Sequence, residues 1–193
     1  MYVIFFGPEG SGKSTQAKLL AEKLNLPYLG SGDLVRKYAA EDKGIMGDVC
    51  RESLAKGHYV ADSEMFVLWK HRLKQPDVQE GWVLDGFPRN PSQAEFLDEK
   101  LDKYDKKVDF VFYLRVSKEV SVERLLKRGR RSPDGSLHDT KEKIRERLRR
   151  YQKGEEGVLL LYQQKGVLYR INGEQSVEKI HQDIVEKVRD DLQ

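Results

Sequence analysis

The N-terminal segment constrains the fold more than any other part of the chain. Residues 2–6 form an uninterrupted apolar run, which is typical of a strand buried on both faces of a sheet. The segment GPEGSGKS, residues 7–14, follows at once and matches the pattern G-x-x-x-x-G-K-[ST]. Apolar residues then recur at helical spacing from Ala17 to Leu24. A strand, a glycine-rich turn and a helix in this order predict a phosphate-binding loop.

The residue types of this loop suit the binding of phosphate groups. Glycines let backbone amides converge on phosphate oxygens with no side chain in the way. Lys13 supplies positive charge to β and γ phosphates, and the helix that follows adds its dipole. Ser14 or Thr15 offers a hydroxyl to Mg²⁺. The motif predicts phosphate binding, but it does not choose between kinases, GTPases and ATPases.

The rest of the chain alternates strand and helix patterns. Further short apolar runs cover residues 82–84, 110–114 and 167–171, with a weaker candidate strand at 27–29. Segments with helical spacing of apolar residues separate these runs. Alternation of this kind predicts an α/β fold, a doubly wound five-stranded parallel sheet with helices on both faces.

Two irregular segments interrupt this pattern. Residues 30–61 carry two short helical stretches broken at Gly44 and Gly47, which indicates an inserted helical flap. Residues 129–139 are too short for more than a small lid, and Asp139 with Glu142 reads as a capping box that opens the next helix. We therefore expect one domain, residues 1–193. Its core comprises residues 1–29, 62–128 and 140–193, its flap residues 30–61 and its short lid residues 129–139.

Composition excludes several other classes of protein. Lys and Arg total 35 against 32 Asp and Glu, so the formal charge of +3 is too small to indicate nucleic-acid binding. No apolar run approaches the length of a membrane span, and the single cysteine, Cys50, has no disulfide partner. The four histidines show no metal-ligand spacing. We expect a cytoplasmic monomer that binds neither zinc, nucleic acid nor membranes.

Two further motifs indicate the reaction. The segments GSGDLVR, residues 30–36, and DGFPR, residues 85–89, follow predicted strands, where ligand sites of open α/β sheets lie. With them the chain resembles the adenylate kinase family of nucleoside-monophosphate kinases over nearly its whole length. The short segment after Arg128 resembles the short-lid forms, without the cysteines of a zinc-binding lid. The resemblance implies reversible, Mg²⁺-dependent transfer of a phosphoryl group from ATP to AMP, giving two ADP.

The resemblance also implies an acceptor site for AMP. Arg36 and Arg89 would hold the AMP phosphate, residues 58–60 would contact the base through backbone groups, and Gln93 would hydrogen-bond adenine. Relatives that prefer UMP and CMP tend to have alanine where Ser31 stands and asparagine where Gln93 stands, so Gln93 favours AMP and a UMP/CMP kinase remains the alternative. The implied AMP-binding residues are Ser31, Arg36, His58, Tyr59, Val60, Gly86, Phe87, Pro88, Arg89, Gln93 and Arg147.

On the donor side, Arg124 and Arg128 are four residues apart and share one helix face. The resemblance implies that the first lies near the adenine of ATP and the second reaches its phosphates. The loop at residues 172–176 either contacts the donor adenine through Gln175 or is only a turn in which Ser176 caps the last helix. The implied ATP-binding residues are Gly10, Ser11, Gly12, Lys13, Ser14, Thr15, Arg124, Arg128 and Gln175, and Ser14 and Asp85 would hold Mg²⁺, the latter through water.

The reaction needs positive charge and positioning more than proton transfer, because the acceptor phosphate is already an anionic nucleophile. Lys13, Arg89 and Arg128 are candidates for stabilising the transition state. Arg147 is the fourth, because it lies beside an apolar helix stripe and matches a catalytic arginine of the family. We expect these four cations to carry catalysis.

The lid departs from the family pattern. The family usually has an arginine where Ser136 stands and two aspartates of which only Asp139 remains. An arginine that touches the transition state contributes about 10³–10⁵ in rate. We hypothesise that Arg130 or Arg131 replaces it. The alternatives are a slower enzyme with both arginines solvated, or a nucleotide-binding regulatory module that has lost catalysis.

Overall fold

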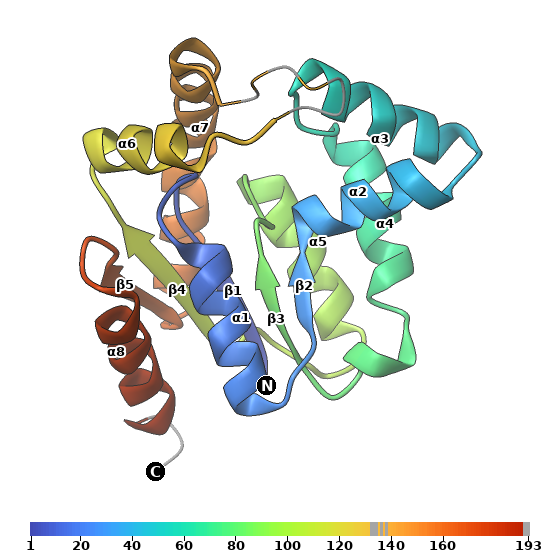
Figure 1. Cartoon of the computed structure of the whole chain (residues 1–193). Helices are drawn as coiled ribbons and strands as arrows, with labels where there is room; N and C mark the ends of the chain where they lie inside the picture. The colour runs from blue at the N-terminus through green and yellow to red at the C-terminus, as the bar shows by residue number, and fades with distance from the viewer. Residues whose placement is uncertain (132–134, 136, 138, 191–193) are drawn as a thin grey trace.

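The computed structural model describes residues 1–131, 135, 137 and 139–190. Its parallel sheet has the strand order β2-β3-β1-β4-β5 (Figure 1). The strands are β1 (Tyr2–Phe6), β2 (Tyr28–Gly30), β3 (Trp82–Asp85), β4 (Phe110–Arg115) and β5 (Leu168–Asn172). The five predicted strands are confirmed to within a residue or two, including the weak candidate that becomes β2.

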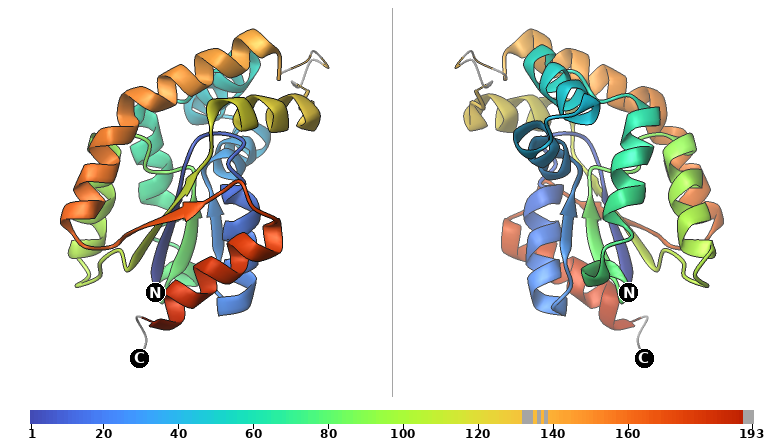
Figure 2. Two further views of the ribbon diagram at one scale, coloured as in Figure 1. Left: turned by 90° about the vertical axis from the view of Figure 1, so that its left-hand side faces the viewer. Right: turned by 90° about the vertical axis from the view of Figure 1, so that its right-hand side faces the viewer.

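Helices cover both faces of this sheet (Figure 2). One face carries α1 (Lys13–Leu24) and α8 (Val177–Asp190), and the other carries α4 (Asp62–Arg72), α5 (Pro91–Asp102) and α7 (Lys141–Gln164). The remaining helices are α2 (Ser31–Glu41), α3 (Ile45–Lys56), α6 (Lys118–Arg128) and the short 3₁₀ helix η1 (Pro76–Val78). The doubly wound α/β fold expected from the sequence is confirmed.

The side chains of β1 show why its apolar run is continuous. Successive residues of a strand point to opposite faces of the sheet. Ile4 packs into the cluster that includes Leu68 of α4 and Leu97 of α5, whereas Phe5 packs into the cluster that includes Leu20 of α1. Both faces are buried, so no position of β1 is free to be polar. The strand is thereby fixed at the centre of the core.

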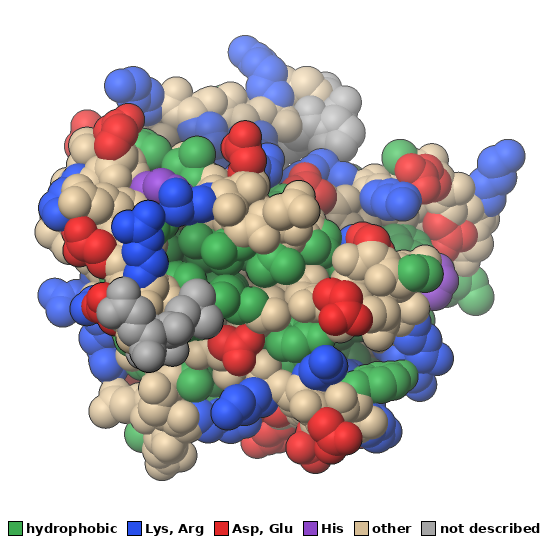
Figure 3. Space-filling view, turned by 90° about the horizontal axis from the view of Figure 1, so that it is seen from below, with side chains coloured by type: hydrophobic (Ala, Val, Ile, Leu, Met, Phe, Trp, Pro, Cys, Tyr) green, Lys and Arg blue, Asp and Glu red, His purple; other side chains and the backbone are tan. Residues whose placement is uncertain are grey.

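The carboxyl ends of the strands meet at one edge of the sheet. Asp85 at the end of β3 is in register with Phe5 of β1 and with Gly30 of β2. The phosphate loop and the segments 30–36 and 85–89 therefore emerge side by side, at the top of Figure 1. Figure 3 shows the opposite end of the molecule, where acidic and basic side chains intermingle around exposed apolar ones. No helix in the described part of the chain is both long enough and apolar enough to cross a membrane.

Two local predictions about the irregular segments were wrong. Gly47 does not break a helix but lies inside α3, where a Cβ atom would come within 1.9 Å of the Asp42 carbonyl oxygen. The glycine serves close packing against the turn between α2 and α3. The N-cap of α7 is Thr140, whose Oγ1 accepts a hydrogen bond from Lys143 N at 3.3 Å, so Asp139 is not the cap of this helix.

Candidate active site

The phosphate loop has the open backbone that its glycines predict. Gly10 and Gly12 have positive φ angles of 85° and 91°, a region that favours glycine. The N-cap of α1 is Gly12, which has no side chain to cap the helix, so within the described part of the chain the first amides of α1 stay open toward the loop. Lys13 Nζ donates to the Pro8 carbonyl at 3.2 Å, and burial lowers the pKa of Lys13 while Asp85 and Glu9 oppose the shift. The arrangement suits a phosphate chain.

Asp85 lies beside this loop with an unused oxygen. Its Oδ2 accepts hydrogen bonds from Ser14 Oγ at 2.5 Å and from Tyr28 Oη at 3.0 Å, while its buried Oδ1 has no hydrogen-bond partner among the described residues. Burial and the neighbouring Asp85 charge raise the pKa of Tyr28. No group of three or more His, Cys, Asp or Glu side chains gathers to hold a metal in the described part of the chain. The hydroxyl and carboxylate oxygens fit Mg²⁺ only with further oxygens from a ligand.

A cleft of about 380 Å³ opens next to the loop, between the segment 31–60, the end of β3 and α7. Among the residues predicted to bind AMP, those that line it are Ser31, Arg36, His58, Tyr59, Val60, Gly86, Phe87, Arg89, Gln93 and Arg147. Pro88 is buried but does not line the cleft. Ser31 Oγ is buried and has no hydrogen-bond partner in the part of the chain that the structure describes, so the cleft wall offers a hydroxyl to a ligand.

Gln93 is held rigidly in the wall of this cleft. Its Oε1 accepts from the Arg89 backbone N–H at 2.8 Å, and its Nε2 donates to Asp62 Oδ1 at 2.7 Å. Asp62 also accepts from Asn90 Nδ2 at 2.7 Å. One N–H of the Gln93 amide is left for a ligand. Asp62 therefore fixes the orientation of Gln93. The sequence predicted a functional role for Gln93 but none for Asp62.

The predicted arginines occupy different surroundings. Arg36 lies on the exposed side of α2 and pairs with Asp33 at 2.7 Å, at the rim of the cleft. Arg89 donates from Nε to the Gly86 carbonyl at 2.8 Å, and its guanidinium lies 3.8 Å from the centroid of the Tyr59 ring. That stacking orients Arg89 toward the cleft and leaves its remaining N–H donors for an anion.

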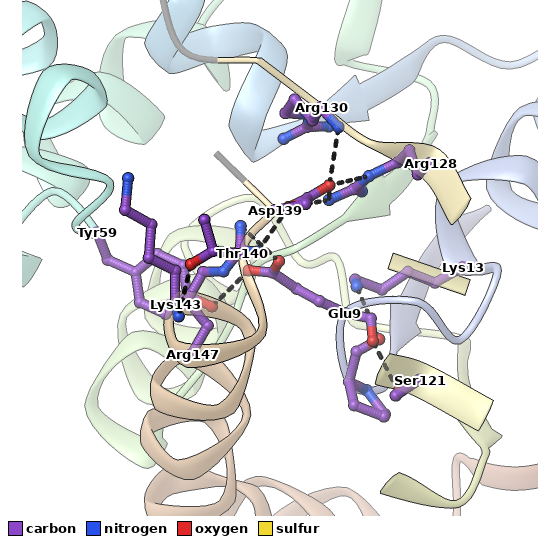
Figure 4. Close-up of polar contacts among 11 residues, drawn as sticks. Glu9, Lys13, Tyr59, Ser121, Arg128, Arg130, Asp139, Thr140, Lys143 and Arg147 are labelled. Atoms are coloured by element: carbon purple, nitrogen blue, oxygen red, sulfur yellow. Dashed lines mark hydrogen bonds and ion pairs between the residues drawn. The ribbon is translucent and has the colours of Figure 1, made fainter. Parts of the chain in front are cut away.

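Arg147 and Arg128 are brought together by Asp139 (Figure 4). Asp139 is fully buried and accepts from Arg147 Nη2 at 2.6 Å and from Arg128 Nε at 3.0 Å. It also accepts from the Arg130 backbone N–H at 3.2 Å. The acid predicted to form a capping box instead pairs with two of the four candidate catalytic cations, and its single negative charge balances only one of their two positive charges.

The donor-side residues are only partly brought together. Arg124 Nη1 donates to the Gly173 carbonyl at 2.9 Å and to the Gly10 carbonyl at 3.4 Å, so it joins the distal loop to the phosphate loop. The Gln175 amide turns to Asp183 of α8, donating at 2.8 Å. Ser176 Oγ accepts from Lys179 N at 3.2 Å, as expected of a cap. Ser136 lies outside the described residues.

The parallel sheet of this order carries a phosphate loop at the end of β1 and a cation-lined cleft beside that loop. This combination defines a P-loop phosphotransferase of the nucleoside-monophosphate kinase class. Residues 5–167 match the adenylate kinase family. This chain belongs to the adenylate kinase family. It is 34% identical to an adenylate kinase of Archaeoglobus fulgidus, over 98% of this chain and 100% of that one. It is 42% identical to adenylate kinase 1 of Synechocystis, over 92% and 91%, and 38% identical to an adenylate kinase of Bifidobacterium longum, over 93% and 95%.

Proposed function

We propose that this chain catalyses the reversible, Mg²⁺-dependent transfer of a phosphoryl group from ATP to AMP, giving two ADP. Membership of the adenylate kinase family supports the activity. The observation that carries the assignment of residues is the convergence of Lys13, Arg89 and Arg147 between the phosphate loop and the cleft. Two polyanions that meet there need such a cluster of cations.

ATP binds along the phosphate loop, and AMP binds in the cleft. The open amides of α1 and Lys13 hold the β and γ phosphates, and Arg89 holds the AMP phosphate with Arg147 beside it. No general base is required, because the AMP phosphate is already an anion. Bound Mg²⁺ would neutralise charge on the ATP phosphates, and Ser14 and Asp85 would hold it.

The acceptor is tested by ADP formation with ATP, Mg²⁺ and either AMP, UMP or CMP. We expect kcat/KM for AMP to exceed that for either pyrimidine by about 100-fold, since Gln93 is fixed to present one N–H. A chelator should abolish turnover and added Mg²⁺ should restore it, with Lys13→Ala as the inactive control. Preference for a pyrimidine would make the chain a UMP/CMP kinase. Binding of both nucleotides without ADP formation would make it a regulatory module.

Arg130 is the better candidate to replace the missing lid arginine. It lines the acceptor cleft, and its pKa is lowered by desolvation and by the charges of Arg128 and Arg36. Arg131 does not line the cleft and donates to the Gly135 carbonyl at 2.9 Å within the lid. Arg130→Ala should lower kcat by about 10²-fold or more, whereas the matched Arg131→Ala should leave it near wild type. Unchanged turnover in Arg130→Ala and in the double variant would contradict the replacement.

Closure of the flap and the lid is part of the proposal. The flap, residues 30–61, holds α2 and α3 and forms one wall of the cleft, and the lid, residues 129–139, connects α6 to α7. Both must close over bound nucleotides, because water in the site would hydrolyse ATP. We also propose a monomer in a reducing, cytoplasmic compartment, in keeping with the lone buried Cys50.

A further inference from the structure

Glu9 is an acidic residue inside the phosphate loop, and the proposed transfer of a phosphoryl group does not need its carboxylate. Its Oε2 lies 3.2 Å from Arg147 Nη1, and its Oε1 accepts a hydrogen bond from Tyr59 Oη at 2.9 Å (Figure 4). Lys13 and Arg89 are also close enough to act on its charge. The carboxylate therefore sits among the same cations that must receive the phosphates.

The charge of Glu9 is stabilised by these neighbours. Burial alone would raise the pKa of the carboxyl, but the charges of Arg147, Lys13 and Arg89 and the hydrogen bond from Tyr59 outweigh it and hold the pKa below its ordinary value. Glu9 is thus ionised at neutral pH. It bridges the phosphate loop, the end of the flap and α7 before any nucleotide arrives.

The backbone of Glu9 is held in place by α6 and cannot shift. Ser121 Oγ donates to the Glu9 carbonyl at 2.8 Å. A Cβ atom on the adjacent Gly10 would lie 2.8 Å from the Ser121 carbonyl oxygen, so the loop is packed tightly on α6. The Glu9 side chain keeps 22% of its surface exposed and is the part that can rotate. Any adjustment to a phosphate must come from the carboxylate itself.

We propose that the Glu9 carboxylate occupies the position of a phosphate group in the nucleotide-free enzyme, where it holds Arg147 and Tyr59. When phosphates bind, this carboxylate must rotate away or take up a proton. The inference rests on the proposed function for the identity of the ligands. A like charge in the site weakens phosphate binding. Glu9 is therefore a positioning residue that sets nucleotide affinity.

The proposal links nucleotide binding to pH. A phosphate beside Glu9 removes the cations from it and adds negative charge, so the pKa of the carboxyl is higher in the complex than in the free enzyme. Where the carboxyl stays in the site, it takes up a fraction of a proton from solvent as the nucleotide binds, and this fraction grows as the pH falls toward the pKa of the complex. Affinity therefore rises as the pH falls, beyond the change that the titration of the nucleotide itself produces.

The test is calorimetric binding of ATP without AMP, and of AMP without ATP, to wild type and Glu9→Gln. The amide keeps the shape and the acceptor for Tyr59 but removes the charge. We expect Glu9→Gln to bind ATP about tenfold more tightly at pH 8. The ratio of the two dissociation constants should shrink as the pH is lowered toward 5.5, since titration of the phosphates is common to both proteins. Glu22→Gln, on the exposed surface of α1, removes the same charge and should change nothing.

A second variant keeps the charge and loosens its anchor. Tyr59→Phe retains the ring that stacks under Arg89 and removes only the hydroxyl that holds Glu9. It should bind ATP more tightly than wild type, though less tightly than Glu9→Gln. Binding of ATP by folded Glu9→Gln that is equal to or weaker than wild type would overturn the proposal, as would equal tightening in Glu22→Gln. Absence of AMP turnover in the wild type would count against the proposed function and would leave this binding comparison intact.

Discussion

At the scale of single residues, Asp139 shows how one buried acid can organise a cationic site. It is fully buried, and its two oxygens accept from Arg128, Arg147 and the Arg130 backbone. Without it, the two guanidinium groups, to which the proposal gives a role in catalysis, would repel each other in a partly buried site. The stability of the site and its charge are therefore set by the same carboxylate.

Asp139→Asn should cost both stability and activity. Breaking a buried ion pair from one side typically costs about 3–5 kcal/mol, and the 38% exposure of Arg128 lowers our expectation to about 2–4 kcal/mol. We expect kcat to fall at least about tenfold, because Arg147 loses its orientation. Urea unfolding and steady-state kinetics measure the two effects. Asp48→Asn, which breaks the exposed pair with Arg51, should cost less than about 1 kcal/mol. Equal losses in the two variants would contradict this role.

Glu9 predicts a pH dependence of stability in the absence of nucleotide. Its pKa is lower in the folded protein than in the unfolded chain, so its contribution is present above the unfolded pKa and is lost as the pH falls through the folded pKa. Wild type should exceed Glu9→Gln in free energy of unfolding by about 1 kcal/mol at pH 7. The gap should begin to narrow as the pH falls below about 4.5, the ordinary value for a glutamate, and should close once the pH lies below the lowered pKa of the folded protein. Urea titrations across this range measure it, and a gap that widens in acid would refute the assigned charge state.

At the scale of elements, α7 is positioned by two glycines. A Cβ atom on Gly154 would lie 2.3 Å from the Arg89 carbonyl oxygen, and one on Gly157 would lie 2.4 Å from Pro91 Cγ. The helix can therefore approach the segment that carries Arg89 closely enough to set Arg147 against the cleft. The glycines cost helix propensity and are retained at a point of close packing.

Gly154→Ala should destabilise the protein although alanine is the better helix former. Overpacking typically costs about 1–3 kcal/mol, which exceeds the propensity gain of about 1 kcal/mol. The contact that must yield is backbone, so Arg89 is displaced and kcat/KM should fall at least about tenfold. Gln152→Ala, at an exposed position of α7, should stay within about 0.5 kcal/mol of wild type. Thermal unfolding and kinetics would detect the contrary result, a more stable and fully active Gly154→Ala.

At the scale of the whole molecule, the acceptor cleft joins the flap, the sheet edge and α7. A ligand that contacts all three should stabilise the fold as a unit. AMP at 100 times its dissociation constant should add about 2.7 kcal/mol, which corresponds to a rise in Tm of about 5–10 °C. Scanning calorimetry measures the rise, with UMP at the same concentration as the control. Equal shifts with AMP and UMP would contradict a cleft selective for adenine.

Much of the fold could be predicted from the sequence because its signals are local. The apolar run of β1 and the glycine pattern of residues 7–14 identify strand, loop and helix without knowledge of the neighbours. The prediction that Gly47 breaks a helix was wrong because its packing partner, the Asp42 carbonyl, is a tertiary contact. The assignment of Asp139 to a capping box was wrong for the same reason, because Asp139 accepts hydrogen bonds from Arg128 and Arg147 through tertiary contacts.

The sequence by itself determined the class of fold, the phosphate loop and the candidates around the acceptor cleft, since each rests on residue type and spacing along the chain. Only the tertiary structure decided how these residues are held. It placed Glu9 against Arg147 and Tyr59 and fixed Gln93 through Asp62. It also packed α7, at Gly154, against the backbone of Arg89. These contacts join residues that lie far apart in the chain, and the energies of charge and packing depend on distance in space, which no local pattern records.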